Sequence, residues 1–266
     1  MTTPPKPDVI EAGTGALSRA LLIHSSVSGA RQWRSLMDAL APDWHSIAVN
    51  LYGYGSTPPW PDDRAQTLTD QARLVASAIP DDTRPIAIVG HSFGASVAMK
   101  LAALSGPRVS HLVLIEPNPF YLLRQQGRLD AFAEAVALRD VVLRGAHTKD
   151  MMPAAAYFAD YWTGKGAWEA MPTDRQEKFA SALAANVHEW AAVMDETTSA
   201  AEWARDLPSA TTVITARDTV RTICEIAEIL AAHAPNWQFE TLDRGGHMAP
   251  LTAPDLVNPL IRRALG

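Results

Sequence analysis

Short runs of apolar residues alternate with stretches of helical periodicity along most of the chain. The runs are apolar almost throughout, which is typical of strands buried on both faces of a mostly parallel sheet. Alternation of such strands with helices predicts an α/β fold in which helices flank a central sheet. The predicted strands are residues 20–24, 46–49, 86–89, 111–115, 211–214 and, more weakly, 237–242.

Apolar spacing also predicts two helices that bear on function. After position 92, apolar residues recur at intervals of four, four and three, which predicts a helix over about 93–104. Near the end of the chain, apolar residues between 256 and 261 line one face of a terminal helix, and Pro254 suits its first turn.

Residues 117–207 interrupt this alternation of strands and helices, because they contain no convincing strand and their pattern predicts several helices. They hold 11 of the chain's 19 aromatic residues, a density that favours a helical lid over an apolar cavity. The predicted architecture is a core of residues 1–116 and 208–266 with residues 117–207 as its cap. Candidate pocket residues are Phe120, Tyr161, Trp162 and Met248.

Composition narrows the possible partners. A chain of 266 residues with 47% hydrophobic and 20% charged residues has an ordinary globular composition. Its net charge of −6 gives no attraction to nucleic acids or anionic membranes, and no apolar run is long enough to span a bilayer. The first residues also lack the apolar core of a signal peptide. We therefore expect a cytoplasmic protein that acts on a small molecule; neither pattern nor composition specifies its oligomeric state.

The strongest chemical signal is Gly-His-Ser-Phe-Gly at positions 90–94, between a predicted buried strand and a predicted helix. A nucleophile in such a tight turn sits in a strained backbone conformation, so its neighbours two residues away must be small. Gly90 and Gly94 meet that need around Ser92. The turn raises the Ser92 hydroxyl above the sheet edge, where the helix dipole favours negative charge.

This strand–turn–helix arrangement resembles the α/β-hydrolase family, and the resemblance extends over nearly the whole chain. It implies an eight-stranded, mostly parallel sheet with a lid inserted after the sixth strand, in the place of residues 117–207. It also implies that Ser92 is the nucleophile.

A serine needs a base to remove its proton. His247 lies in Gly-Gly-His-Met at 245–248, after the last predicted strand and before the last helix, where the family keeps its base. The two glycines allow the loop to bring the imidazole over Ser92. His91 lies inside the turn and is expected to point away from the pocket side of Ser92, whereas His24 matches a family histidine with a structural role.

Two carboxylates are candidates to orient the base. Asp218 lies 29 residues before His247 and holds the usual family position after the seventh strand, so the spacing favours it. Glu116 ends the strand before the insertion, where some relatives such as haloalkane dehalogenases carry their acid. A carboxylate at the end of a central strand is costly to bury unless it is paired. Either one would hold the imidazole tautomer and stabilise the imidazolium.

The segment at 24–30 resembles the family's His-Gly-x loop, with Ser25 in place of the usual glycine. The resemblance implies that the backbone amides of Ser26 and Phe93 form the oxyanion hole.

A serine nucleophile forms an acyl-enzyme, so the expected reaction is hydrolysis of a carboxylic ester or a related acyl bond. It argues against dehalogenation and ordinary epoxide hydrolysis, for which relatives use an aspartate. No metal or organic cofactor is needed for acyl chemistry on this triad. Alternatives on the same triad are carbon–carbon bond hydrolysis and cofactor-free perhydrolysis. A further alternative is a non-catalytic member of the fold that binds a small ligand.

Overall fold

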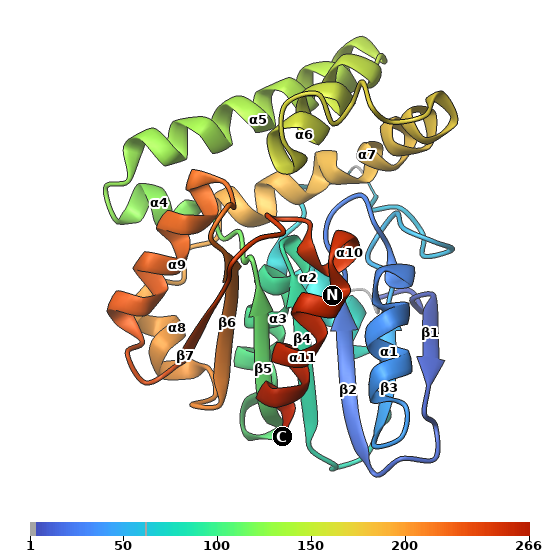
Figure 1. Ribbon diagram of the computed structural model, residues 1–266, viewed down its shortest axis with the longest axis vertical. Coiled ribbons are helices and arrows are strands. Elements are labelled where there is room, and N and C mark those ends of the chain that lie inside the picture. Colours follow the sequence, from blue (N-terminus) through green and yellow to red (C-terminus); the bar gives the residue numbers. More distant parts are fainter. Residues whose placement is uncertain (1–3, 62) are drawn as a thin grey trace.

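The computed structural model describes residues 4–61 and 63–266 (Figure 1). In this described part, seven strands form one sheet in the order β1-β3-β2-β4-β5-β6-β7. Neighbouring strands run parallel except β1, which pairs antiparallel with β3. The strands are β1 (Val9–Ala12), β2 (Ser18–Ile23), β3 (Trp44–Val49), β4 (Ile86–His91), β5 (Val109–Ile115), β6 (Thr211–Ala216) and β7 (Gln238–Leu242).

Six of these strands are predicted by the apolar runs, and the structure confirms them with small differences at their ends. The pattern misses β1, because this short edge strand is only half buried and has no continuous apolar run. The resemblance implied eight strands with the insertion after the sixth. Within the described residues the sheet has seven strands, and the helical segment follows the fifth, β5.

Two apolar cores lie on opposite faces of the sheet, because successive residues of a strand point to opposite sides. In β2, Leu21 and Ile23 belong to one core, whereas Ala20 and Leu22 belong to the other. This arrangement explains why the strands are apolar throughout. The first core is covered mainly by α2 (Leu68–Ala76), α3 (Phe93–Ser105) and α9 (Arg221–His233), and the second by η1 (Ala30–Trp33), α1 (Arg34–Leu40), α10 (Ala249–Thr252) and α11 (Pro254–Leu265).

Both helices predicted from spacing are confirmed. The helix α3 begins at Phe93, directly after Ser92, and α11 begins at Pro254. Residues Val257, Ile261 and Leu265 of α11 are buried against the sheet, in keeping with its amphipathic pattern.

Helices fill the connection between β5 and β6, as the sequence predicts. In Figure 1, α5, α6 and α7 lie above the carboxyl ends of the parallel strands. In contrast, α8 packs beside α9 at the flank of the sheet. The helices of this connection are α4 (Tyr121–Gln125), α5 (Leu129–Thr148), α6 (Met152–Thr163), α7 (Thr173–Met194) and α8 (Ala200–Asp206).

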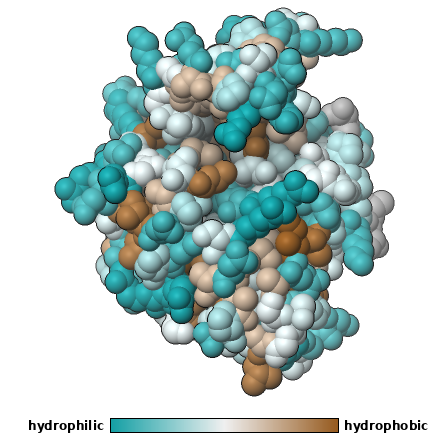
Figure 2. Space-filling view, turned by 45° about the vertical axis from the view of Figure 1, so that its right-hand side comes forward, coloured by the Kyte–Doolittle hydropathy of each residue, from teal (hydrophilic) through white to brown (hydrophobic). Residues whose placement is uncertain are grey.

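On the face shown in Figure 2, apolar side chains occur in small groups between hydrophilic ones. Exposed large apolar residues come from separate elements, such as Leu104 on α3 and Leu129 on α5. None of the described helices has the length and apolar character needed to cross a bilayer.

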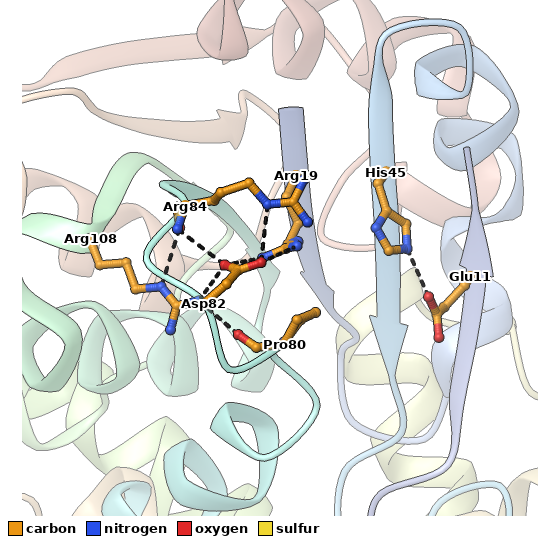
Figure 3. Close-up of polar contacts among 7 residues, drawn as sticks. All are labelled: Glu11, Arg19, His45, Pro80, Asp82, Arg84 and Arg108. Carbon is orange, nitrogen blue, oxygen red and sulfur yellow. Dashed lines mark hydrogen bonds and ion pairs between the residues drawn. The ribbon is translucent and has the colours of Figure 1, made fainter. Parts of the chain in front are cut away.

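An ion-pair cluster joins three segments at the amino-terminal ends of the parallel strands, on the side of the sheet opposite α5, α6 and α7 (Figure 3). The guanidinium of Arg19, at the start of β2, is 2% exposed and forms two 3.0 Å hydrogen bonds with Asp82. Asp82 lies in the loop before β4 and also accepts hydrogen bonds from Arg84 and Arg108. Hydrogen bonding from Arg19, above all, holds the pKa of the Asp82 carboxyl well below its usual range.

We expect Asp82→Asn to lower the melting temperature by several degrees at neutral pH, because buried Arg19 loses its charged partner. Folding lowers the pKa of Asp82, so its stabilisation is present above the unfolded pKa of about 4 and is lost as the pH falls towards the folded pKa. The difference in melting temperature between Asp82→Asn and wild type should therefore be smaller at about pH 3 than at about pH 7. Asp81→Asn is the matched control at an exposed neighbour. Equal melting temperatures for Asp82→Asn and wild type at neutral pH contradict this role.

Candidate active site

The turn between β4 and α3 carries Ser92 in a strained conformation, with φ 55° and ψ −119°. Its geometry depends on the two glycines. A Cβ on Gly94 would collide with the carbonyl oxygens of Ile23 and His24, and one on Gly90 would collide with the backbone of the new helix. The glycines therefore allow α3 to start directly against the end of β2, as the motif predicts.

Three side chains from separate loops meet at this turn. The Oγ of Ser92 lies 2.9 Å from Nε2 of His247, and Nδ1 of His247 lies 3.1 Å from Oε2 of Glu116. All three residues are almost fully buried. Because the carboxylate accepts the Nδ1 proton, Nε2 carries the free lone pair and faces the serine hydroxyl. The arrangement has the geometry of a nucleophile, a base and an orienting acid.

Glu116 is the carboxylate that contacts the base. It follows β5 with a positive φ of 51° and is 1% exposed. Its Oε1 accepts a 2.6 Å hydrogen bond from the amide of Ala216, and its Oε2 accepts one from the hydroxyl of Thr219. These donors, together with His247, compensate for the burial of the charge.

Asp218, which the spacing favours, does not contact His247. Its exposed carboxylate accepts hydrogen bonds from the amides of Gly245 at 3.2 Å and Gly246 at 2.8 Å. These bonds, that from Gly246 first, lower the pKa of Asp218. The residue is in the sequence position expected of the acid, but its side chain turns to the backbone of the loop that carries the base.

His91, inside the turn, contacts the backbone of the base rather than Ser92. Its Nε2 donates a 2.8 Å hydrogen bond to the carbonyl oxygen of His247, and its Nδ1 accepts a 3.0 Å bond from the amide of Gln32. Burial, followed by the nearby His247 imidazole, lowers the pKa of His91 well below its usual value. A neutral His91 therefore links the loop after β2 to the loop that carries His247.

The loop after β2 begins at His24, which is buried and neutral. Its Nδ1 donates to the carbonyl oxygen of Ser25, and its Nε2 accepts from the amide of Leu51. Burial lowers the pKa of His24 to about 4. Ser25, in place of the expected glycine, is held to Gln32 through both its amide and its hydroxyl.

Ser26, the next residue of this loop, and Phe93 both line the cavity that Ser92 lines. In the described part of the chain, neither of their backbone amides donates to a protein acceptor. Two such donors beside a nucleophile could stabilise an oxyanion. The hydroxyl of Ser26 is engaged elsewhere, because it donates to the carboxylate of Glu189 on α7.

The cavity has a volume of about 420 Å³ and lies between the sheet edge and the helices α6 and α7. Of the predicted pocket residues, Phe120, Trp162 and Met248 line it. Contrary to expectation, Tyr161 does not; it packs edge-on against Trp162 and its hydroxyl pairs with Thr222. The indole of Trp162 stacks on the His247 ring with centroids 3.9 Å apart.

Sequence reasoning missed the part of the cavity wall that comes from α7. Asn186, Glu189, Trp190 and Val193 all line the cavity. Their spacing of three, one and three residues is that of one helix face, so the pattern contained a usable signal. Its two polar members are nearly fully buried, which is unusual for a helix face.

The described residues contain no group of three His, Cys, Asp or Glu side chains that could hold a metal ion. A family model described as the alpha/beta hydrolase family matches residues 20–260, which is most of the chain. The chain belongs to the alpha/beta hydrolase family.

Similar proteins include a lipase and the solved structures of a hydrolase and an esterase. The lipase LipV of Mycobacterium tuberculosis is 35% identical over 108 residues, which are 40% of this chain and 39% of that protein. The matching segment thus spans about two fifths of that relative. The crystal structure of a hydrolase from Pseudomonas aeruginosa PA01 has a TM-score of 0.79 at 21% identity, covering 97% of this chain and 93% of that one. An esterase from Exiguobacterium antarcticum has a TM-score of 0.73 at 17% identity, covering 98% and 96%.

We expect substitutions of Glu116 and Asp218 in this α/β-hydrolase to have clearly different effects on the reactivity of Ser92. Glu116→Gln should slow labelling of Ser92 by a fluorophosphonate by about 10³–10⁴-fold, because the imidazole loses its orienting charge. Asp218→Asn should slow it less than about tenfold, because an amide oxygen can still accept from the loop backbone. Labelling rates measured by mass spectrometry test both. The assignment is wrong if Asp218→Asn causes the larger loss.

Stability should fall as the pH drops from about 6.5 to about 4. The unfolded chain takes up a proton on His24 near its usual pKa of about 6.5, whereas the folded chain does so near pH 4. In that window the unfolded state binds more protons, so the free energy of unfolding decreases by about 1.4 kcal/mol per pH unit from this residue.

Urea unfolding at about pH 7.5 and about pH 5 measures this dependence. His24→Gln should flatten it, whereas His111→Gln, at a half-buried position on β5, serves as the control. An unchanged slope in His24→Gln would show that His24 is not a source of the acid sensitivity.

Proposed function

We propose that this chain is a serine hydrolase that cleaves ester-type acyl bonds of small, largely apolar substrates through an acyl-enzyme. The observation that carries the proposal is the hydrogen-bonded series Ser92–His247–Glu116, with separations of 2.9 and 3.1 Å. Membership of the alpha/beta hydrolase family and the similarity to a lipase support the same class of reaction.

In the first half-reaction, Ser92 Oγ attacks the substrate carbonyl carbon while its proton passes to Nε2 of His247. The carbonyl oxygen becomes an oxyanion, which accepts hydrogen bonds from the amides of Ser26 and Phe93. The imidazolium is stabilised by Glu116 at Nδ1 and by the face of Trp162, whose ring centroid lies 3.9 Å from that of His247. Protonated His247 then gives its proton to the leaving alcohol as the carbon–oxygen bond breaks.

In the second half-reaction, His247 removes a proton from water, and the resulting hydroxide attacks the acyl carbon. Collapse of the second tetrahedral intermediate returns the proton to Ser92 Oγ and releases the carboxylic acid. On the protein side, only Ser92 and His247 exchange protons in this cycle; the leaving alcohol accepts one proton and water supplies one.

Residues 117–207 act in this proposal as the lid of the site. The cavity wall that they provide is mainly aromatic, with Phe120, Phe158, Trp162 and Trp190 among its members. A cavity of about 420 Å³ with several aromatic residues in its wall suits a small acyl or alcohol group.

The proposal is tested by turnover of p-nitrophenyl esters with acyl chains of increasing length. Ser92→Ala should lower kcat by about 10⁵–10⁶-fold, because no other group can form the acyl-enzyme. Ser105→Ala, which changes the last residue of α3, should keep the wild-type rate. A fluorophosphonate should add its phosphonyl group to the peptide that contains Ser92.

The proposal fails if wild type and Ser92→Ala show the same near-zero rate across the ester panel and neither is labelled. Turnover of a diketone or of peroxide in place of esters would instead favour the carbon–carbon hydrolase or perhydrolase alternatives. Tight ligand binding without turnover would favour a binding protein.

A further inference from the structure

The cavity wall contains a buried carboxylate that the reaction does not use. Glu189 on α7 is 2% exposed, and no Lys or Arg of the described residues lies within ion-pair distance of it. Its Oε1 accepts a 2.8 Å hydrogen bond from Tyr54, and its Oε2 accepts from Ser26 and, at 2.7 Å, from Asn186. Burial raises its pKa, and these hydrogen bonds oppose that effect. Burying a carboxylate without a cation is costly, so its contacts need a functional explanation.

Two of the three partners of Glu189, Ser26 and Tyr54, connect it to one strained segment. Val27, next to Ser26, has a φ of 65°, which is an unfavourable conformation for a β-branched residue. Its amide donates a 3.1 Å hydrogen bond to the hydroxyl of Tyr54, and that hydroxyl donates to Glu189. Glu189 therefore holds Ser26 directly, through its hydroxyl, and Val27 through Tyr54. Strain of this kind persists where surrounding contacts over-determine the backbone, commonly at functional sites.

The two sides of this segment are fixed by different layers of the protein. On one side, Gln32 holds Ser25 and is itself bonded to His91 in the core. On the other side, the contacts come from α7, in the helical segment between β5 and β6. The backbone amide of Ser26 lies between these two anchors.

We propose that Glu189 is a positioning residue that holds the Ser26 amide in place for the oxyanion, so that the oxyanion hole is complete only when α7 packs against the core. This inference rests on the proposed hydrolase function. Ionised Glu189 can accept from all three donors at once, whereas glutamine would present an amide N–H to at least one of them. The carboxylate does not touch the reacting atoms; it acts through the loop.

The test compares Glu189→Gln with wild type on a p-nitrophenyl ester and on a matched pair of ketones. A trifluoromethyl ketone forms a tetrahedral adduct with Ser92, in which the serine proton moves to His247 and the ketone oxygen becomes an oxyanion. Its methyl analogue stays a ground-state ligand. We expect kcat and trifluoromethyl ketone affinity to fall together by about 10–100-fold, somewhat less than the loss of a whole oxyanion donor. KM and methyl ketone affinity should change little.

Two further variants separate positioning from folding. Ser26→Ala keeps the backbone amide but removes the hydroxyl held by Glu189, so it should reproduce the loss in kcat even if Glu189→Gln folds poorly. Glu177→Gln makes the same change at an exposed site on α7 and should match wild type. Melting temperatures measured alongside show whether any loss merely follows unfolding.

The outcomes distinguish the two proposals. If wild type binds the trifluoromethyl ketone and reacts with fluorophosphonate, but Glu189→Gln and Ser26→Ala keep its kcat, the role of Glu189 is overturned alone. A rise in KM at constant kcat also overturns it, because Glu189 would then bind substrate. If wild type neither binds the trifluoromethyl ketone nor is labelled at Ser92, the hydrolase function fails and the role of Glu189 fails with it.

Discussion

Close packing of α3 against the end of β2 fixes the position of the other parts of the site. Gly94 leaves no room for a Cβ beside the carbonyl oxygens of Ile23 and His24, so the start of the helix lies directly on the loop that contains Ser26. The strained backbone of Ser92 is held in this position because its amide donates to the carbonyl oxygen of Ile115 on β5. His91, in the same turn, holds the backbone of the base. One tight turn thus sets the relative placement of Ser92, His247 and the loop that contains Ser26.

The contact between Glu116 and His247 follows from the order of the strands. Because β5 and β6 are neighbours, the residues that follow them lie close together, and a carboxylate on either loop could reach the same imidazole edge. Glu116 occupies that position because its amide continues the ladder to Ile214 while its side chain accepts from Ala216 of β6. Glu116 has a positive φ, and its side chain contacts Nδ1 of His247. Asp218, on the loop after β6, instead accepts hydrogen bonds from the backbone of the loop before His247.

Local signals in the sequence predict the sheet, the two helices around it and the turn at Ser92, because each depends on residues within one short segment. The placement of His247 beside Ser92 can be predicted too, since its loop has its own glycines. The choice between Asp218 and Glu116 cannot be made this way, because it depends on side-chain direction and on donors from other strands, such as Ala216 and Thr219. The contacts of Glu189 are harder still to predict. Nothing near it in sequence indicates that its partners are Ser26 and Tyr54, more than 130 residues away.

The helical segment between β5 and β6 therefore cannot be treated as a passive cover. Trp162 of α6 stacks on the His247 ring, and Glu189 of α7 accepts a hydrogen bond from Ser26 in the loop beside Ser92. Both contacts are buried among apolar groups, where electrostatic interactions are stronger than in water. The same two helices also supply nine of the 22 residues that line the cavity. Changes in their packing would alter the shape of the cavity and the geometry of the reacting groups together. Under the proposed function, substrate choice and rate are therefore coupled through one structural element, whereas the turn at Ser92 is held by the core.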